Sequence, residues 1–398
     1  MKLEKGGVYI VSGARTPHGS YRGALSGLSA TALGAHAVKA ALARAPSIKP
    51  EAVDELIIGN VLSANLGQNP AKQCAVASGL PSSVPCSTVN KVCASGLKAV
   101  TNGAQSIMTG HATTVVAAGT EAMSNCPLYV SSAIRGSKAL PVSGLLRDGL
   151  TDAYGSKEVM GLKAEHCAGE HGISREEQDN CALESYRKVR KAHEEGWLDN
   201  EIAPILCEDG IRVIEKDEPL SRFNPQSLSW LKPAFDAAKG TVTAATAASI
   251  SDGASAVVLM SGSKAEELGV KPLARVVEWA DAELEPDDFI TAPAVAVNKV
   301  MQRSGFLLDQ VDVFEINEAF SVSVLANISL LGLDIDKVNL HGGSLAIGHP
   351  LGSSGCRILV SLLTVMLRTG ARLGCACVCN GGGGATAVLL ERVDEFPA

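Results

Sequence analysis

Three segments of the sequence carry side chains that could take part in covalent chemistry, and the first contains Cys93. Residues 89–100 pass from a strand-like run through Cys93 into a helix of small residues, so Cys93 is predicted at a helix N-terminus. Unpaired N–H groups and the positive end of the helix dipole stabilise a thiolate there, and the thiolate is the nucleophilic form of cysteine. A buried structural cysteine is the alternative, because most free cysteines are core residues.

The second segment, residues 339–355, is rich in glycine and contains the dipeptide His349-Pro350. Gly348 allows the backbone to approach a ligand closely, whereas Pro350 disfavours helical dihedral angles at His349 and suits the first turn of a following helix. An imidazole held on such a turn could deprotonate a thiol, as in other Cys–His pairs. A structural histidine that caps the turn is the alternative, and it is the role that we favour for His341.

The third segment, residues 375–385, places cysteines at alternate positions and then a run of glycines. Strand periodicity puts Cys375, Cys377 and Cys379 on one face, but only Cys379 lies at the strand end where a site could open. The amide N–H groups of the glycine run, which begins at Gly381, have no shielding Cβ and form a natural oxyanion pocket. A phosphate-binding P-loop is excluded because no Gly-Lys-Ser/Thr sequence follows.

Asn317 is a further candidate, in residues 314–320, where a strand is predicted to enter a helix. Its amide could fix a water molecule or donate a hydrogen bond to a substrate. A plain helix N-cap would suit the same residue equally well.

Composition excludes several classes of protein. The 398 residues are 46% hydrophobic and 19% charged, and no uninterrupted apolar run reaches about 18 residues, which excludes a disordered chain and a membrane span. The net charge of −7 and the lack of long Lys/Arg runs argue against nucleic acid or a membrane surface as a partner. Eleven cysteines without a secretory leader or a Cys-x-x-Cys pair predict reduced thiols in the cytoplasm and no metal site.

The chain looks duplicated. Apolar β-branched runs alternate with Ala-rich segments of helical length, which is an α/β pattern. Residues 53–58 resemble residues 311–316, and Gly110 and Gly370 each end a predicted helix before a similar small-residue strand. We therefore expect two copies of one α/β unit, in an N-terminal domain of residues 1–268 and a C-terminal domain of residues 269–398.

Residues 124–246 interrupt the first copy. They are richer in charge and lack strand alternation, so they are expected to form an inserted loop domain that acts as a lid, with plain surface elaboration as the alternative. Ser174 and Glu177 form a capping-box signal that opens a helix through about Glu195, with Gly196 as its stop.

Taken together, these segments resemble the thiolase family. Residues 90–96, 317–320, 342–350 and 379–383 occur in the order and spacing of that family, and the resemblance runs end to end. It implies the thiolase fold, in which two topologically equal α/β halves form five layers, α-β-α-β-α, and a loop domain covers the site.

The resemblance also implies roles for the candidate residues. Cys93 is the residue that becomes acylated, His349 is the base that activates it, and Cys379 is the second acid/base. Asn317 holds a water that, with His349, binds one thioester oxygen, while the amides of Cys93 and Gly381 bind the other. The implied reaction is the reversible Claisen condensation of two acetyl-CoA molecules to acetoacetyl-CoA and CoA, through an acetyl-cysteine.

Substrate contacts are carried over in the same way. Met160 and Phe320 fall where the family lines its acyl and pantetheine pocket, and Arg222 falls where relatives approach the nucleotide end of CoA. Residues 246–248 depart from the family pattern, so a pantetheine contact is lost or has passed to Ser249.

Two further departures bear on specificity. Val159 stands where short-chain biosynthetic members often carry histidine, which leaves a 3-ketoacyl-CoA thiolase for longer chains as the alternative. Leu220 replaces a tyrosine that helps to bind potassium in some members, which predicts no dependence on a monovalent cation. A non-catalytic CoA- or lipid-binding scaffold is the remote alternative.

The resemblance finally implies partners. CoA thioesters are substrates, no cofactor is tightly bound, and the protein is a homodimer or homotetramer. Residues 135–138 lie where relatives place a tetramer-forming loop.

Overall fold

The computed structural model describes residues 3–4, 6–130, 140–206 and 211–393. Its main sheet contains strands from two halves of the chain. The strands of the first half are β1 (Val8–Arg15), β2 (Gly19–Ser20), β3 (Glu55–Gly59), β4 (Cys86–Val89), β5 (Thr114–Ala122) and β10 (Ser251–Ser261). Those of the second half are β11 (Ala274–Glu283), β12 (Val313–Ile316), β13 (Leu373–Asn380) and β14 (Gly384–Arg392).

The two halves repeat one pattern of strand pairing. The strand order is β12-β13-β14-β11-β1-β10-β5-β3-β4, with β2 paired to β10. In the first half β3 is parallel to β5, and β5, β10 and β1 follow in antiparallel pairs. In the second half β12 is parallel to β13, and β13, β14 and β11 follow in antiparallel pairs. The duplication expected from the sequence is therefore confirmed, and β1 and β11 join the halves.

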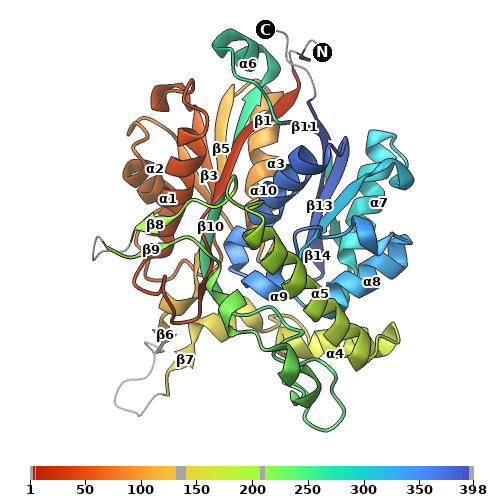
Figure 1. Cartoon of the computed structure of the whole chain (residues 1–398). Coiled ribbons are helices and arrows are strands. Elements are labelled where there is room, and N and C mark those ends of the chain that lie inside the picture. Colours follow the sequence, from red (N-terminus) through yellow and green to blue (C-terminus); the bar gives the residue numbers. More distant parts are fainter. Residues whose placement is uncertain (1–2, 5, 131–139, 207–210, 394–398) are drawn as a thin grey trace.

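Helices lie between the two halves of this sheet and on their outer faces, which gives a layered fold. α3 (Ser95–Met108) and α10 (Leu351–Thr369) pack against each other and against strands of both halves, so they form the central layer (Figure 1). α1 (Ala30–Ala43) and α2 (Pro70–Ser78) cover the outer face of the first half, whereas α7 (Ala292–Ser304) and α8 (Ser321–Leu331) lie on the outer side of the second. The expected five-layer order α-β-α-β-α is what these contacts produce. α6 (Gly262–Leu268) follows β10, and α9 (Ser344–Ile347) precedes α10.

The core explains why the strands read as apolar runs rather than as alternating patterns. On β5, Val116 and Ala118 belong to the cluster beneath α1, while Val115 and Ala117 belong to the cluster around α3 and α10. Side chains of a strand alternate between its faces, and here both faces are buried. A third cluster, which includes Cys375 and Cys377, lies beneath α7.

The central helix α10 is the one helix of the described ranges that is long and apolar enough to cross a membrane. Most of it is buried inside the fold, which is the environment of a core helix. Its apolar character is therefore accounted for by its position between the two halves.

The inserted segment contributes no strand to the main sheet within the part that the structure describes. It contains α4 (Met160–Glu170), α5 (Arg175–Glu194) and two short hairpins, β6 (Leu128–Tyr129) with β7 (Val142–Ser143) and β8 (Ile205–Leu206) with β9 (Val213–Ile214). The capping box of Ser174 and Glu177 is present at the start of α5, as expected. The predicted tetramer-forming residues 135–138 lie outside the described residues.

A buried ion-pair network holds the insert to the first half. Arg15 on β1 contacts Glu201 at 2.6 Å and Asp217 at 2.7 Å, and all three side chains are buried. His193 on α5 also meets Asp217, at 3.1 Å. Although burial alone would raise it, the pKa of Asp217 is held well below its ordinary value by Arg15 and His193.

Candidate active site

Cys93 lies in a strained turn between β4 and α3. Val92, the residue before it, has a φ of 48°, which is unfavourable for a β-branched side chain. Asn90 Oδ1 accepts the N–H of Val92 at 2.9 Å, and Ser95 Oγ donates to the carbonyl of Val92 at 2.6 Å. These bonds compensate the strain and present Cys93 two residues before the first helical residue, close to the predicted helix N-terminus.

Glycines let the two central helices touch backbone to backbone. A Cβ on Gly96 of α3 would lie 2.8 Å from the carbonyl oxygen of Gly352 on α10, and a Cβ on Gly355 would lie 2.5 Å from the N of Leu97. Any larger residue would therefore force the helices apart. Because Cys93 and His349 each precede this crossing by three residues, the crossing brings together the turns that carry them.

His349 is held with one nitrogen available. Its Nδ1 lies 2.6 Å from Ser354 Oγ, and that hydroxyl donates its single proton to the carbonyl of Pro350 at 3.0 Å. The hydroxyl must therefore accept from Nδ1–H, which leaves Nε2 as the unprotonated nitrogen. Nε2 is buried and meets no hydrogen-bond partner among the described residues. Burial, and then the charge of Arg357, lower the pKa of His349 to about 3, so the ring is neutral at neutral pH.

The charge state of Cys93 differs from the sequence expectation. Burial raises the pKa of its thiol to about 12, and this outweighs the lowering by the backbone N–H groups of Gly381 and of Cys93 itself. The sequence placed Cys93 correctly near a helix N-terminus, but the desolvation of its sulfur depends on neighbours that are distant in the chain. The resting group is therefore a neutral thiol, which needs a base.

Cys379 comes to the site from the second half. It is buried near the end of β13 and belongs to a different apolar cluster from Cys375 and Cys377, which are core residues as expected. Burial, and then the neighbouring Cys93, raise the pKa of Cys379 well above its usual value. Lys91 Nζ donates to Asn380 Oδ1 at 3.1 Å and so links the Cys93 turn to the Cys379 strand end.

Asn317 follows β12 and is buried. It is not the N-cap of α8, because that helix begins at Ser321 with Phe320 as its N-cap residue, so the N-cap interpretation is wrong. Asn317 Oδ1 accepts from Ser344 Oγ at 2.8 Å and from Arg357 Nη2 at 3.1 Å. Its Nδ2 has no hydrogen-bond partner in the described part of the chain, so a donor is free for a water or a substrate oxygen.

Apolar side chains border the Cys379 thiol. Met160 and Phe320 pack in the same cluster as Cys379, and Met160 Sδ lies 3.3 Å from the point where a Cβ on Gly381 would be. Phe235 meets Phe320 edge to face, with ring centroids 6.3 Å apart. The structure thus brings Met160 and Phe320 to the site.

Arg222 and Ser249 lie on the wall of one cavity of about 420 Å³, which Tyr186 and Phe223 also line. The carbonyl of Ser249 accepts the N–H of His349 at 3.0 Å, so the cavity wall continues to His349. Arg222 is exposed and pairs with Glu218 at 3.1 Å. The two predicted CoA-binding residues therefore share a cavity that adjoins the candidate active site.

Comparison with known proteins places this geometry in a family. The model of the thiolase N-terminal domain matches residues 8–263, and the model of the thiolase C-terminal domain matches residues 270–392. The chain belongs to the thiolase family. Acetyl-CoA acetyltransferase IA of Candida tropicalis is 51% identical over 395 residues, which cover 97% of this chain and 98% of that protein.

Solved thiolases share the fold. The structure of Acat5 thiolase from Ascaris suum in complex with coenzyme A is 44% identical, with a TM-score of 0.93, and the match covers 97% of this chain and 100% of that one. Human mitochondrial 3-ketoacyl-CoA thiolase is 35% identical with the same TM-score, over 97% of this chain and 99% of that one. The shape of the fold therefore does not separate these two kinds of thiolase.

Sequence reasoning did not assign roles to several residues that shape the site of this thiolase. Ser354 orients His349, and Ser344 and Arg357 orient Asn317. Ser354 is five residues after His349 and could have been found by asking what the first turn of the helix presents to the ring. The contacts of Asn317 join residues 27 and 40 positions apart, for which the sequence offered no local signal.

Glu121 was also missed. Its buried carboxylate accepts N–H groups from Val61, Leu62 and Gly352 and the amide of Asn60, so it joins the loop after β3 to the first turn of α10. Burial raises the pKa of Glu121 to about 7 despite these four donors. The arrangement fixes the start of the helix that follows His349.

His341 is structural, as favoured from the sequence. Its Nε2 accepts from Arg368 Nε at 2.8 Å, and its ring stacks on Trp197 with centroids 5.3 Å apart. These contacts tie α10 to the residues after α5.

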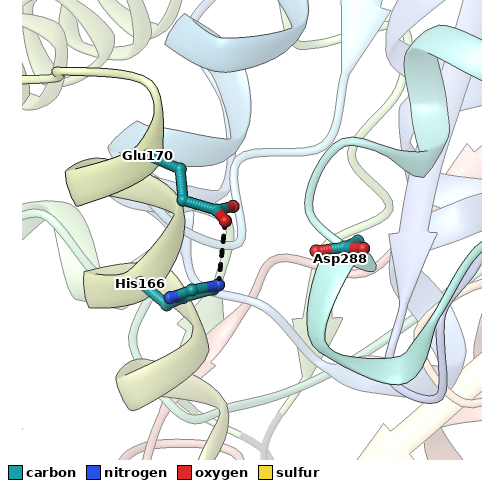
Figure 2. Close-up of side chains that lie close together, drawn as sticks. All are labelled: His166, Glu170 and Asp288. Atoms are coloured by element: carbon teal, nitrogen blue, oxygen red, sulfur yellow. Dashed lines mark ion pairs between the residues drawn. The ribbon is translucent and has the colours of Figure 1, made fainter.

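His166, Glu170 and Asp288 form one group of possible metal ligands within the described residues (Figure 2). His166 and Glu170 occupy successive turns of α4 and pair with each other at 3.2 Å, and all three residues are exposed. Exposed acidic clusters of this kind are common without an ion, so the cluster does not by itself identify a metal site.

Proposed function

We propose that the chain catalyses the reversible condensation of two acetyl-CoA molecules to acetoacetyl-CoA and CoA, through an acetyl-cysteine at Cys93. The observation that carries the proposal is the convergence of the Cys93 thiol from one half with the Gly381 N–H and the Cys379 thiol from the other. Carbon–carbon bond formation needs a second base besides the one that activates the nucleophile, and Cys379 supplies it. The name of the 51% identical relative supports the same reaction.

The first half-reaction transfers the acetyl group. The sulfur of Cys93 attacks the thioester carbon of acetyl-CoA while its proton passes to Nε2 of His349. The N–H groups of Cys93 and Gly381 stabilise the oxyanion. Cys379 donates its proton to the departing CoA sulfur, so CoA leaves as a neutral thiol, and the positive charge on His349 offsets the cost of the new thiolate.

The second half-reaction forms the carbon–carbon bond. The Cys379 thiolate removes a proton from the methyl group of a second acetyl-CoA, while His349 and the free Nδ2 of Asn317, through a water, stabilise the enolate oxygen. The enolate carbon attacks the acetyl group on Cys93. The Cys93 sulfur then leaves and recovers its proton from His349, so all three groups return to their starting protonation states.

Labelling with radioactive acetyl-CoA tests the nucleophile. Wild type should incorporate one acetyl group per chain, whereas Cys93→Ala should incorporate none. Cys86→Ala, which removes a partly exposed cysteine on β4, is the matched control and should label normally. Asn317→Ala should turn over about 10²–10³ times more slowly yet still be acylated. Stoichiometric labelling of Cys93→Ala would show that the nucleophile is another residue.

Chain-length preference separates this proposal from its alternatives. Met160, Phe235 and Phe320 pack around Cys379 and support a short acyl pocket. Turnover of acetoacetyl-CoA should therefore exceed that of 3-ketohexadecanoyl-CoA, and the reverse result would favour a 3-ketoacyl-CoA thiolase for long chains. Absence of exchange between CoA and acetyl-CoA would favour a non-catalytic CoA- or lipid-binding scaffold.

The proposal extends to binding and assembly. We propose that Arg222 and Ser249 bind CoA, that no cofactor is tightly held, and that the chain divides near residues 268 and 269. A homodimer or homotetramer is expected, and native mass measurement would tell them apart. The described cysteines are free thiols, which suits a reducing compartment such as the cytoplasm.

A further inference from the structure

The amide of Asn317 is fixed by two donors on the same oxygen. Ser344 Oγ and Arg357 Nη2 both reach Oδ1, at 2.8 and 3.1 Å. Arg357 Nη2 also donates to Ser344 Oγ at 2.8 Å, so the three groups form a closed triangle. A hydroxyl has one proton, and here that proton goes to Asn317, because the guanidinium can only donate.

This triangle decides which end of the amide faces the site. A carboxamide presents an acceptor on one side and donors on the other, and the two ends look alike in shape. If the amide turned over, its NH₂ group would face Arg357 and Ser344, and donor would oppose donor. Oδ1 of Asn317 is therefore held against Arg357 and Ser344. Nδ2, which has no partner among the described residues, is held toward the site.

The contacts of Arg357 are not those of a stabilising ion pair. It is 1% exposed, its nearest carboxylate oxygen, on Glu315, lies 3.9 Å away, and its own Nε has no hydrogen-bond partner in the described part of the chain. A buried charge is costly unless its partners are close and its hydrogen bonds complete. The close contacts that Arg357 does make are with Asn317 and Ser344.

We propose that Arg357 is a positioning residue that, with Ser344, orients the Asn317 amide so that Nδ2 donates toward the enolate oxygen. This inference rests on the proposed function, because the enolate belongs to the condensation half-reaction. It goes further in assigning a role to a residue that touches neither thiol. Acetyl transfer to Cys93 relies on the N–H groups of Cys93 and Gly381 and on His349, which Arg357 influences only through its charge. Ser344→Ala and Arg357→Lys keep that charge.

Variants of Ser344 and Arg357 test the proposal. Ser344→Ala removes one donor to Asn317 and keeps the charge, and Arg357→Met removes the other. Arg357→Met combined with Glu315→Gln avoids a buried unpaired carboxyl group if the single variant folds poorly. Arg368→Met is the matched control, since Arg368 lies on the same helix and contacts His341 and Trp197 instead.

Three rates are measured on each variant. Exchange between CoA and acetyl-CoA reports acetyl transfer, and deuterium exchange at the acetyl-CoA methyl group together with condensation kcat reports enolate formation. We expect condensation and deuterium exchange to fall about 10–100-fold in the Ser344 and Arg357 variants, with KM little changed. Acetyl exchange should stay within a few-fold of wild type in Ser344→Ala, which keeps the charge near His349. Arg357→Lys, which retains a donor and the charge, should recover part of the loss.

Unchanged condensation in both Ser344→Ala and the Arg357 variants would overturn the proposal. An equal loss in both half-reactions of Ser344→Ala, which keeps the charge of Arg357, would also overturn it, because that is the result of a general structural role. Wild-type protein without acetyl exchange would instead refute the proposed function, so the two failures are distinguishable.

Discussion

The resting charge of Cys93 is a measurable consequence of its burial. Burial raises the pKa of this thiol from 9.0 to about 12 and lowers the pKa of His349 from 6.5 to about 3. Three pKa units correspond to about 4 kcal/mol against the thiolate, so about one Cys93 in 10⁵ is ionised at pH 7. We therefore expect no thiolate–imidazolium pair in the free protein. In the proposed mechanism the proton leaves Cys93 only as the sulfur attacks a substrate.

Thiolate absorbance and alkylation test this expectation. Wild type and Cys93→Ala are compared from about pH 5 to pH 9, and the ultraviolet difference spectrum should show no thiolate band. Alkylation of Cys93 by iodoacetamide, followed by mass spectrometry, should accelerate about tenfold per pH unit over the whole range, because the thiolate fraction does so below its pKa. Cys86→Ala controls for the other partly exposed thiols.

A difference spectrum with a midpoint below about pH 8, or alkylation that levels off near neutral pH, would refute the reasoning. Either result would mean that the N–H groups of Cys93 and Gly381 outweigh burial. His349 would then act on a thiol that had already ionised.

Three further predictions concern single contacts. Ser354→Ala should lower kcat about 10–100-fold with little change in KM, because it frees the His349 ring to change tautomer, whereas Ser353→Ala, whose hydroxyl meets Ser255, should not show this pattern. Gly119→Ala should lower the free energy of unfolding, measured in urea, by about 1–3 kcal/mol, because its Cβ would lie 2.2 Å from the carbonyl oxygen of Gly352. Gly27→Ala is the control and should be nearly neutral, because open space surrounds Gly27. Asp217→Asn should be less stable at neutral pH by about 3–5 kcal/mol. Because Arg15 and His193 outweigh the effect of burial, the pKa of Asp217 lies below 3.8 in the folded protein. Wild type should therefore lose stability as the pH falls below about 4, and denaturation curves of Asp217→Asn should lack that part of the acid dependence.

Much of the fold could be predicted from the sequence because its signals are local. The similarity of residues 53–58 and 311–316 indicated the duplication, and these segments contain β3 and β12. Ser174 and Glu177 predicted the start of α5 because a capping box is complete within four residues. Boundaries were less accurate: Cys93, predicted at a helix N-terminus, lies two residues before the first residue of α3.

The electrostatics of the site could not be predicted in the same way. Proximity to a helix N-terminus favours a thiolate, and that is the only influence on Cys93 that neighbouring residues reveal. The desolvation that outweighs it comes from packing against residues such as Leu351, contributed by the other half. The backbone conformation of Val92 could not be predicted either. β-branched residues favour strands, yet Val92 adopts a left-handed φ that tertiary contacts enforce.

Glycines allow close contact between α3 and α10 where these helices cross. Forty glycines and an aromatic content of 4% would weaken an ordinary core, since glycine adds conformational entropy to the unfolded chain and buries little surface. At Gly96 and Gly355 the absence of Cβ lets two helices meet at their backbones. Each half supplies one helix to that crossing, and the residues just before each helix carry Cys93 and His349. Duplication therefore does more than enlarge the core: it brings the turn of the proposed nucleophile, from one half, to the turn of the proposed base, from the other.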